Sequence, residues 1–265
     1  MKRIWGHVMS MVVAGLALGS VMPSCATNDQ SIFVRGALLP SSNRVNGACV
    51  YTNDSQQGEL FFGTMDVGLT DSYTSVLIVG NQLIPRGDPN ANRAESNRVH
   101  VNGGVIRVTE TDGRLIREFT SVSTGFADPA NNNAPSYAVI GLITFDAPTK
   151  DIILNRNGDH PEQMGLPNRS IIKTVLLNIK VFGRSLGGED LESDEYQFPL
   201  QVCKGCLVDI VSGNDPAQMP QPNCKRALPM GTTIPRPCFF GQDEGVSCQS
   251  CLGSFPVCDP TIKNP

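Results

Sequence analysis

The chain contains nine cysteines, and their uneven placement constrains the fold more than any other feature. Cys25 and Cys49 are the only two before residue 203, and the other seven lie between residues 203 and 258. An even number of cysteines in an exported chain favours a disulfide framework. If Cys25 serves another purpose, eight remain for four disulfides, whose pairing the spacing leaves open. These eight are Cys49, Cys203, Cys206, Cys224, Cys238, Cys248, Cys251 and Cys258.

Cys49 has no neighbour of its own kind in the first half of the expected mature chain. It must stay free or pair with a cysteine from the far end, and we expect that partner to be Cys203 or Cys206. Such a bridge closes a loop of more than 150 residues. By the chain-entropy argument, it stabilises the fold by roughly 4 to 5 kcal/mol.

The first 24 residues have the order of features of a secretory signal peptide. A short basic head, Lys2 and Arg3, precedes a mostly apolar stretch at 4–22 and then small residues. Such a segment is removed from the mature protein. The Pro-Ser-Cys end at 23–25 favours a bacterial lipobox, in which Cys25 is the lipid attachment site and becomes the first residue.

Two other interpretations of this segment stay open. Ser24-Cys25-Ala26 also fits ordinary cleavage between small residues, which would give a secreted or periplasmic protein. The stretch 4–22 is close to the ~20 residues that span a membrane, so an uncleaved anchor is the third interpretation. With a lipobox, acyl chains such as palmitate contribute about 0.8 kcal/mol per buried CH₂ and hold the protein on a membrane.

Charge and composition narrow the class of protein. Signal removal takes away two basic residues and leaves 19 basic and 25 acidic ones, a net charge of −6. Such a chain lacks the basic footprint of a nucleic-acid-binding protein, so we expect no nucleic-acid partner. Glycine (26 residues) and proline (19 residues) are frequent, and strongly periodic helical segments are missing. This composition favours an all-β protein with long loops.

Short apolar or alternating runs recur along most of the chain, separated by turn residues. They predict an all-β, immunoglobulin-like β-sandwich at 32–211, after a tether at 25–31. Residues 212–265 are rich in proline and cysteine and are expected to form an irregular, disulfide-stapled appendage. The predicted strands are 32–38, 49–52, 60–67, 73–83, 105–110, 115–119, 137–145, 152–154, 170–182 and 196–202.

One hairpin can be assigned a register from the sequence alone. An Asp-Gly pair at 112–113 suits a two-residue turn, because both central positions need positive φ. Counting back from that turn places Arg107 opposite Glu118 and Ile106 opposite Phe119. An ion pair and an apolar pair then fall on opposite faces of the hairpin.

Pro199 modifies the prediction for the strand at 196–202. Proline cannot donate a ladder hydrogen bond, so we expect this strand to lie at an edge or a bulge.

Two Cys-x-x-Cys pairs, Cys203/Cys206 and Cys248/Cys251, have three interpretations. They can be structural disulfide partners, a Cys₄ zinc site, or a redox motif. We favour disulfides, because 41 residues separate the two pairs and four more cysteines need partners. The redox interpretation weakens because 207–212 makes a poor helix after the first pair. We therefore assign no metal ligands and expect no cofactor.

Other chemical motifs are weaker. The Gly-x-Ser-x-Gly pattern around Ser185 matches a hydrolase elbow, but no histidine follows it, so we interpret it as a glycine-rich turn. The calcium-like stretches 88–92 and 155–159 are interpreted as turn chemistry. His160 lies between two carboxylates and leaves a transition-metal site as an alternative. We assign no catalytic residue.

The lipobox-like start, the β-rich body and the junction at 198–207 (FPLQVCKGCL) together resemble uncharacterised lipoproteins of Gram-negative bacteria. The resemblance implies a lipid on Cys25. Ala26, directly after that cysteine, implies sorting to the outer membrane of the cell envelope.

We therefore expect a non-catalytic, membrane-anchored envelope lipoprotein with a structural or protein- or glycan-binding role. Its long polar loops at 85–97, 128–135 and 155–168 are the expected contact surface, because loops on a rigid scaffold commonly carry binding. The alternative is a secreted or periplasmic enzyme, either a thiol oxidoreductase through Cys203 and Cys206 or a metal-dependent hydrolase near His160.

Overall fold

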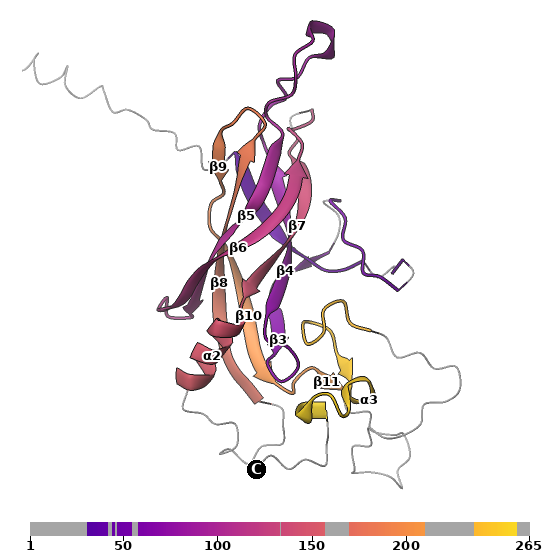
Figure 1. Ribbon diagram of the computed structural model, residues 1–265, viewed down its shortest axis with the longest axis vertical. Coiled ribbons are helices and arrows are strands. Elements are labelled where there is room, and N and C mark those ends of the chain that lie inside the picture. The colour runs from indigo at the N-terminus through magenta and orange to yellow at the C-terminus, as the bar shows by residue number, and fades with distance from the viewer. Residues whose placement is uncertain are drawn as a thin grey trace, which may run out of the picture.

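Strands form most of the regular structure in the described residues, and most of them build two β-sheets packed face to face (Figure 1). This computed structural model describes residues 31–41, 44–45, 47–54, 58–132, 134–156, 170–209 and 236–258. The expected all-β sandwich is confirmed. No helix in these ranges is long and apolar enough to cross a membrane.

The smaller sheet has four antiparallel strands in the order β2-β1-β4-β7. They are β1 (Ile32–Leu38), β2 (Glu59–Leu60), β4 (Tyr73–Asn81) and β7 (Ser136–Phe145).

The larger sheet has the order β3-β10-β8-β5-β6, and β9 pairs with the end of β8. Its neighbours are antiparallel except for β3 and β10, which are parallel. The strands are β3 (Gly63–Asp66), β5 (Val99–Glu110), β6 (Leu115–Ala127), β8 (Ser170–Ser185), β9 (Asp190–Glu192) and β10 (Tyr196–Lys204).

The core lies between the two sheets and follows the alternation of the sequence. The predicted inward face of β8 is fully buried, as are facing residues from the four-stranded sheet. These residues are Val175, Leu177, Ile179 and Val181 on β8, Leu77 and Val79 on β4, and Leu142 on β7.

Two predicted strands are wrong. Residues 49–52 form no strand, and 152–154 lie in a helix, α2 (Ala147–Arg156). Asp146 starts this helix, because its carboxylate accepts the Thr149 backbone N–H at 3.0 Å, and proline is favourable in a first helical turn. The apolar residue Ile153 is buried against the core, so the short apolar run marks the inner face of a helix.

The predicted strand at 60–67 is divided between the sheets. Leu60 ends β2 in the four-stranded sheet, and β3 begins at Gly63 in the other sheet. The two residues that link the strands, Phe61 and Phe62, are exposed. The chain therefore crosses from one sheet to the other within three residues.

The hairpin of β5 and β6 confirms most of the predicted register. Ile106 pairs with Phe119, and Arg107 pairs with Glu118, whose side chains form an ion pair at 3.3 Å. The predicted two-residue turn is wrong, because Glu110 N donates to the carbonyl of residue 114 at 2.8 Å and encloses a three-residue turn. A shift between residues 108 and 109 restores the expected register.

Pro199 lies in a strand with neighbours on both sides, so the expected edge is only local. Pro199 pairs with Leu176 of β8, but the pairing with β3 starts at Leu200. The proline therefore lies just before the point where β10 gains its second neighbour.

Seven of the eight expected cysteines are disulfide-bonded, and six of them form three described pairs. Cys49 bonds to Cys238 across a sequence separation of 189, so its expected pairing with Cys203 or Cys206 is wrong. Those two cysteines bond to each other. The other pair is Cys251–Cys258, and Cys248 is disulfide-bonded as well. Cys224 lies outside the described residues, as do the signal at 1–24, Cys25 and most of the tether.

The described part of the C-terminal region packs as a small second core beside the sandwich. Strand β11 (Val208–Asp209) pairs in parallel with β12 (Val246–Ser247), followed by α3 (Cys248–Cys251) and the turn η5 (Pro256–Cys258). Leu69, from the loop after β3, completes this cluster.

The same region also covers a sheet edge. Asp66 N donates to the Gly241 carbonyl, and Asp243 N donates to the Thr64 carbonyl, each at 2.9 Å. Residues 241–243 therefore extend the larger sheet beyond β3 and protect its edge.

Candidate functional site

Two of the three predicted binding loops lie together. The segments at 82–98 and 128–135 meet at one end of the sandwich, where the first projects beyond the strands (Figure 1). The third begins at the end of α2, which lies at the opposite end, and 157–168 fall outside the described residues. Two of the three loops therefore form one surface, called the loop end here.

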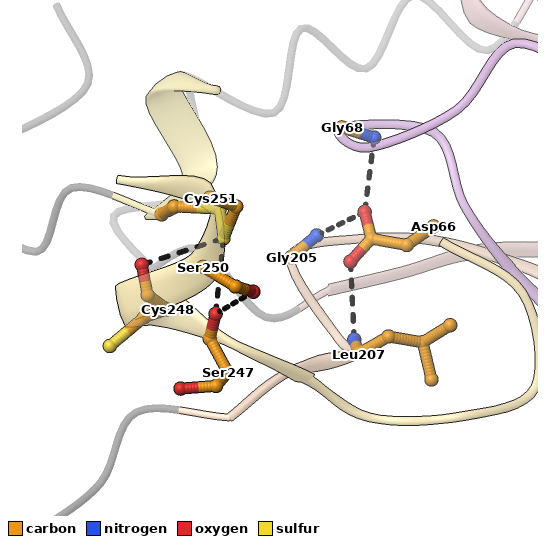
Figure 2. The surroundings of a disulfide bond; sticks show 9 residues. Asp66, Gly68, Gly205, Leu207, Ser247, Cys248, Ser250 and Cys251 are labelled. Atoms are coloured by element: carbon orange, nitrogen blue, oxygen red, sulfur yellow. Dashed lines mark hydrogen bonds between the residues drawn. A yellow bond between two sulfur atoms is a disulfide. The ribbon is translucent and has the colours of Figure 1, made fainter. Parts of the chain in front are cut away.

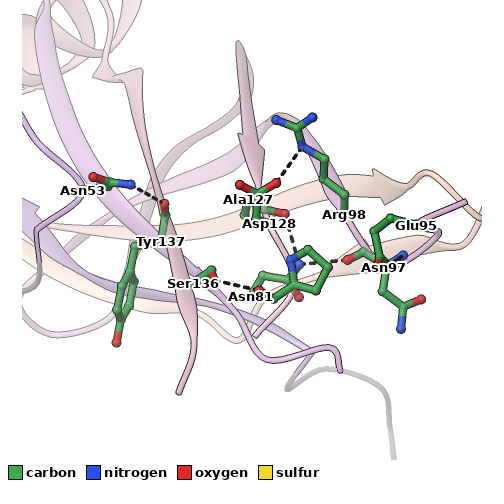
Figure 3. A network of polar contacts seen from close by, with 10 residues as sticks. Asn53, Asn81, Glu95, Asn97, Arg98, Ala127, Asp128, Ser136 and Tyr137 are labelled. Atoms are coloured by element: carbon green, nitrogen blue, oxygen red, sulfur yellow. Dashed lines mark hydrogen bonds and ion pairs between the residues drawn. The ribbon is translucent and has the colours of Figure 1, made fainter. Parts of the chain in front are cut away.

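A buried asparagine holds the two loops together (Figure 3). Asn81, fully buried at the end of β4, donates through Nδ2 to the carbonyls of Asn97 at 2.9 Å and Ala127 at 3.1 Å. Its Oδ1 accepts the Leu83 backbone N–H at 2.9 Å. Asn97 in turn donates through Nδ2 to the Ile84 carbonyl at 2.7 Å. The base of the loop end is thus fixed by satisfied, buried hydrogen bonds.

The longer loop has its own carboxylate support. Glu95 accepts backbone N–H groups from Asn97 at 2.7 Å, Gly87 at 2.8 Å and Arg86 at 3.0 Å. Desolvation raises the pKa of Glu95, but the backbone donors together lower it below its ordinary value. The loop is therefore built around an ionised carboxylate.

The tip of this loop contains the first calcium-like stretch. The turn η2 (Pro89–Ala91) is capped by Asp88, whose carboxylate accepts the Asn90 backbone N–H at 2.9 Å. Asn92 ends the turn with a positive φ of 51°. The Asp and Asn residues thus serve the turn itself, as expected from the sequence.

A groove of about 490 Å³ opens between the two loops. Ile84, at its wall, is 74% exposed, although a large aliphatic side chain is more stable when buried. The described lining has no charged or aromatic side chain. It consists of Gln82, Ile84, Pro85, Ala130, Asn131, Asn132 and Pro135.

Arg98 and Phe126 border the loop end on the side of β5 and β6. Arg98 Nε lies 2.9 Å from Asp128 Oδ1, and its guanidinium lies over the Phe126 ring at 4.8 Å. His100 stacks on the same ring with a centroid distance of 4.6 Å, and its Nε2 lies 3.0 Å from Thr124 Oγ1. Phe126 thus has a cation and an imidazole against it.

Ser185 serves a turn, as expected from the sequence. Its Oγ accepts the Glu189 backbone N–H at 3.1 Å, which closes the turn between β8 and β9. Ser185 pairs with Val99, so His100, the next residue, points to the opposite face of the sheet. The serine and the histidine cannot act as a nucleophile and its base.

A second candidate site lies at the other end of the sandwich, where β10 leaves the sheet. Oxygen of Asp66 and the sulfurs of Cys203 and Cys206 lie within 4.8 Å of one another. Asp66 is fully buried, and Figure 2 shows its carboxylate between three backbone donors. Oδ1 accepts from Gly205 at 2.7 Å, and Oδ2 accepts from Leu207 at 3.1 Å.

The third donor to Asp66 is Gly68, at 3.0 Å from Oδ1. Burial raises the pKa of Asp66 above its ordinary value, although the three backbone donors and the charge of Lys204 act in the opposite direction. A buried carboxyl with a raised pKa can hold a proton closer to neutral pH than an exposed one.

Asp66 and Asn81 were not predicted from the sequence. Each ends a strand as a polar residue, and polar residues at strand ends are common in turns. The zinc interpretation does not match the structure, because Cys203, Cys206, Cys248 and Cys251 are all disulfide-bonded. His160 lies outside the described residues.

Comparison with known proteins identified no relative of this chain. No protein-family profile, curated protein or solved structure matches this chain.

Proposed function

We propose that this protein is a non-catalytic, lipid-anchored lipoprotein of the bacterial envelope, in the outer membrane, that binds a partner protein through its loop end. The observation that carries the proposal is the groove of about 490 Å³ with the exposed Ile84 at its wall, on loops fixed by Asn81. The volume of this groove lies within the range of known ligand sites, and its loops are carried by the sandwich and held at their base by buried hydrogen bonds.

The groove chemistry favours a peptide segment over a glycan. Ile84, Pro85 and Ala130 offer apolar contact, while Gln82 and Asn131 offer amide donors and acceptors that match a peptide backbone. Sugar rings commonly stack on aromatic side chains, and the described lining contains none. A short apolar segment of an envelope protein is therefore the proposed ligand.

A crosslinking experiment tests the binding surface. A photoreactive amino acid at position 84 should give a discrete protein adduct in the native envelope. The same amino acid at position 115 is the matched control, because Leu115 is 45% exposed and begins β6, at the end of that strand away from the loop end and not next to β10. Equal adducts at both positions, or none at either, would contradict a binding role for the loop end.

The anchor is tested by the intact mass of protein extracted from membranes. We expect a chain that begins at Cys25 and carries a lipid-sized increment. Without reductant, a thiol-alkylating reagent should add no mass, because the expected disulfides occupy the other eight cysteines. A Cys25→Ala variant should leave the membrane fraction. An unlipidated chain beginning near residue 27 would instead indicate a secreted protein.

A further inference from the structure

The Cys203–Cys206 disulfide differs from the other two described bridges in the length of the loop that it closes. It closes the shortest loop, with a sequence separation of 3, against 189 for Cys49–Cys238 and 7 for Cys251–Cys258. A disulfide stabilises a fold less as its loop becomes shorter. Opening this bridge therefore costs the fold least, and the other bridges remain to hold it.

The two sulfurs have different surroundings. Cys203 is fully buried in β10, where its carbonyl accepts the Val67 backbone N–H at 2.8 Å and its backbone pairs with Ile171. Cys206 is half-buried in the turn that leaves the strand. An incoming thiolate reaches the sulfur that is accessible, so Cys206 is the side open to attack and Cys203 is the leaving group.

The surroundings of Cys203 suit a thiol as well as a disulfide. Its sulfur lies 3.4 Å from the Met65 carbonyl, which can accept a hydrogen bond from S–H. The buried Asp66 carboxyl also has an oxygen within 4.8 Å of both sulfurs. A proton can pass between groups at this separation after a small rotation or through one water.

We propose that Cys203 and Cys206 form a redox-active pair that exchanges with an external dithiol, and that Asp66 supplies the proton to Cys203. This inference goes beyond the proposed binding function and is independent of it. The pair lies at the start of β8, whereas the loop end lies beside the end of that strand.

The proposed exchange has two steps. A thiolate of the external dithiol attacks Cys206 Sγ, the bond between the two cysteines breaks, and Cys203 Sγ leaves with the electron pair and takes the proton from Asp66. The second thiolate of the external dithiol then attacks the first sulfur of the same dithiol, which is now bonded to Cys206. The bond to Cys206 breaks, and Cys206 leaves as a thiolate. The external dithiol becomes a disulfide, and two electrons have reduced the protein pair.

The first test measures which bridge is reduced in the native full chain. Samples treated with dithiothreitol are quenched with acid, alkylated and mapped by mass spectrometry. Cys203 and Cys206 should be labelled together, at least about tenfold faster than Cys251 and Cys258, with an unchanged far-ultraviolet circular dichroism spectrum. Reduction of both pairs at the same rate, or only after unfolding, would overturn the proposal.

The second test separates proton transfer from a structural role of Asp66. If Asp66 donates the proton, Asp66→Asn should slow the reduction of the Cys203–Cys206 disulfide about 100-fold at pH 7. A merely structural Asp66 predicts the opposite sign, because loss of its bonds to Gly205 and Leu207 would loosen the turn and expose the sulfurs. Asp243→Asn is the matched control, since Asp243 is a half-buried carboxyl outside the sulfur cluster, and its rate should stay within about twofold.

A third measurement does not depend on how well the Asp66 variant folds. Cys203→Ser leaves Cys206 as the remaining thiol of the pair, and Cys206→Ser leaves the buried Cys203. With 5,5′-dithiobis(2-nitrobenzoate) as the probe, Cys203→Ser should react about 100-fold faster than Cys206→Ser. Equal or reversed rates would contradict the assignment of Cys206 as the attacked sulfur.

Discussion

Glu95 supports the longer loop of the loop end through backbone hydrogen bonds to its carboxylate. The neutral Glu95→Gln side chain keeps the size but loses acceptor capacity toward the backbone N–H groups of Arg86 and Gly87. We expect these two amides to exchange with solvent about tenfold faster in the variant. Hydrogen exchange measured by NMR tests this, and Glu118→Gln, which changes an exposed carboxylate on β6, should leave both rates unchanged.

The same residue makes the loop sensitive to acid. The pKa of Glu95 is lowered in the folded protein, so its contribution is complete above the unfolded pKa of about 4.3 and is lost as the pH falls through the folded pKa. Protection of the Arg86 and Gly87 amides should therefore fall in acid in the natural protein. A similar fall in Glu95→Gln would mean that another group is responsible.

Single polar residues also mark the limit of prediction from the sequence. Asn81 and Asp66 each satisfy several backbone groups, yet the partners of Asn81 reach 46 residues away and those of Asp66 reach 141. Nothing local distinguishes them from an exposed residue at a strand end. Their importance arises only when the fold brings distant backbone groups to them.

At the scale of elements, prediction succeeded where local pattern and tertiary packing agree. The β5–β6 register follows from Arg107 and Glu118, because cross-strand pairs are local in the sequence. The turn itself was wrong, since Gly113 takes a φ of +88° at the end of a three-residue loop. The one-residue shift in the strand hides this error from any count made further along the hairpin.

The strand predicted at 152–154, which is part of the helix α2, was wrong for a related reason. Three consecutive apolar residues at 152–154 fit a short strand as well as the inner side of a helix, because periodicity cannot separate the two over such a length. The information that decides is the start of the helix, where Asp146 and Pro148 provide a cap and a favourable first turn.

At the scale of the whole molecule, one covalent bond joins the two ends of the described chain. Cys49–Cys238 links the segment after β1 to the residues that cover β3. Replacing both cysteines by serine should lower the free energy of unfolding by roughly 5 kcal/mol, against about 2.5 kcal/mol for Cys251 and Cys258.

Urea unfolding of the two double variants measures this difference. The reverse ranking would show that the small C-terminal core, and not the long loop, depends most on its bridge. The long-range pairing itself could not be predicted, because the spacing permits every far-end cysteine as a partner for Cys49 and only the path of residues 236–244 selects Cys238.

Residues 241–243, which protect the edge of β3, are synthesised long after that strand. A ribosome adding about 5–20 residues per second needs roughly 10 to 40 seconds to travel from Cys49 to Cys238, 189 positions later. Throughout that interval the nascent sandwich has an open edge and an unpaired Cys49, while Cys203 and Cys206 emerge first and compete for it. An exported chain meets oxidant only outside the cytosol, so any early bridge from Cys49 to Cys203 or Cys206 would have to reshuffle by thiol–disulfide exchange to give Cys49–Cys238.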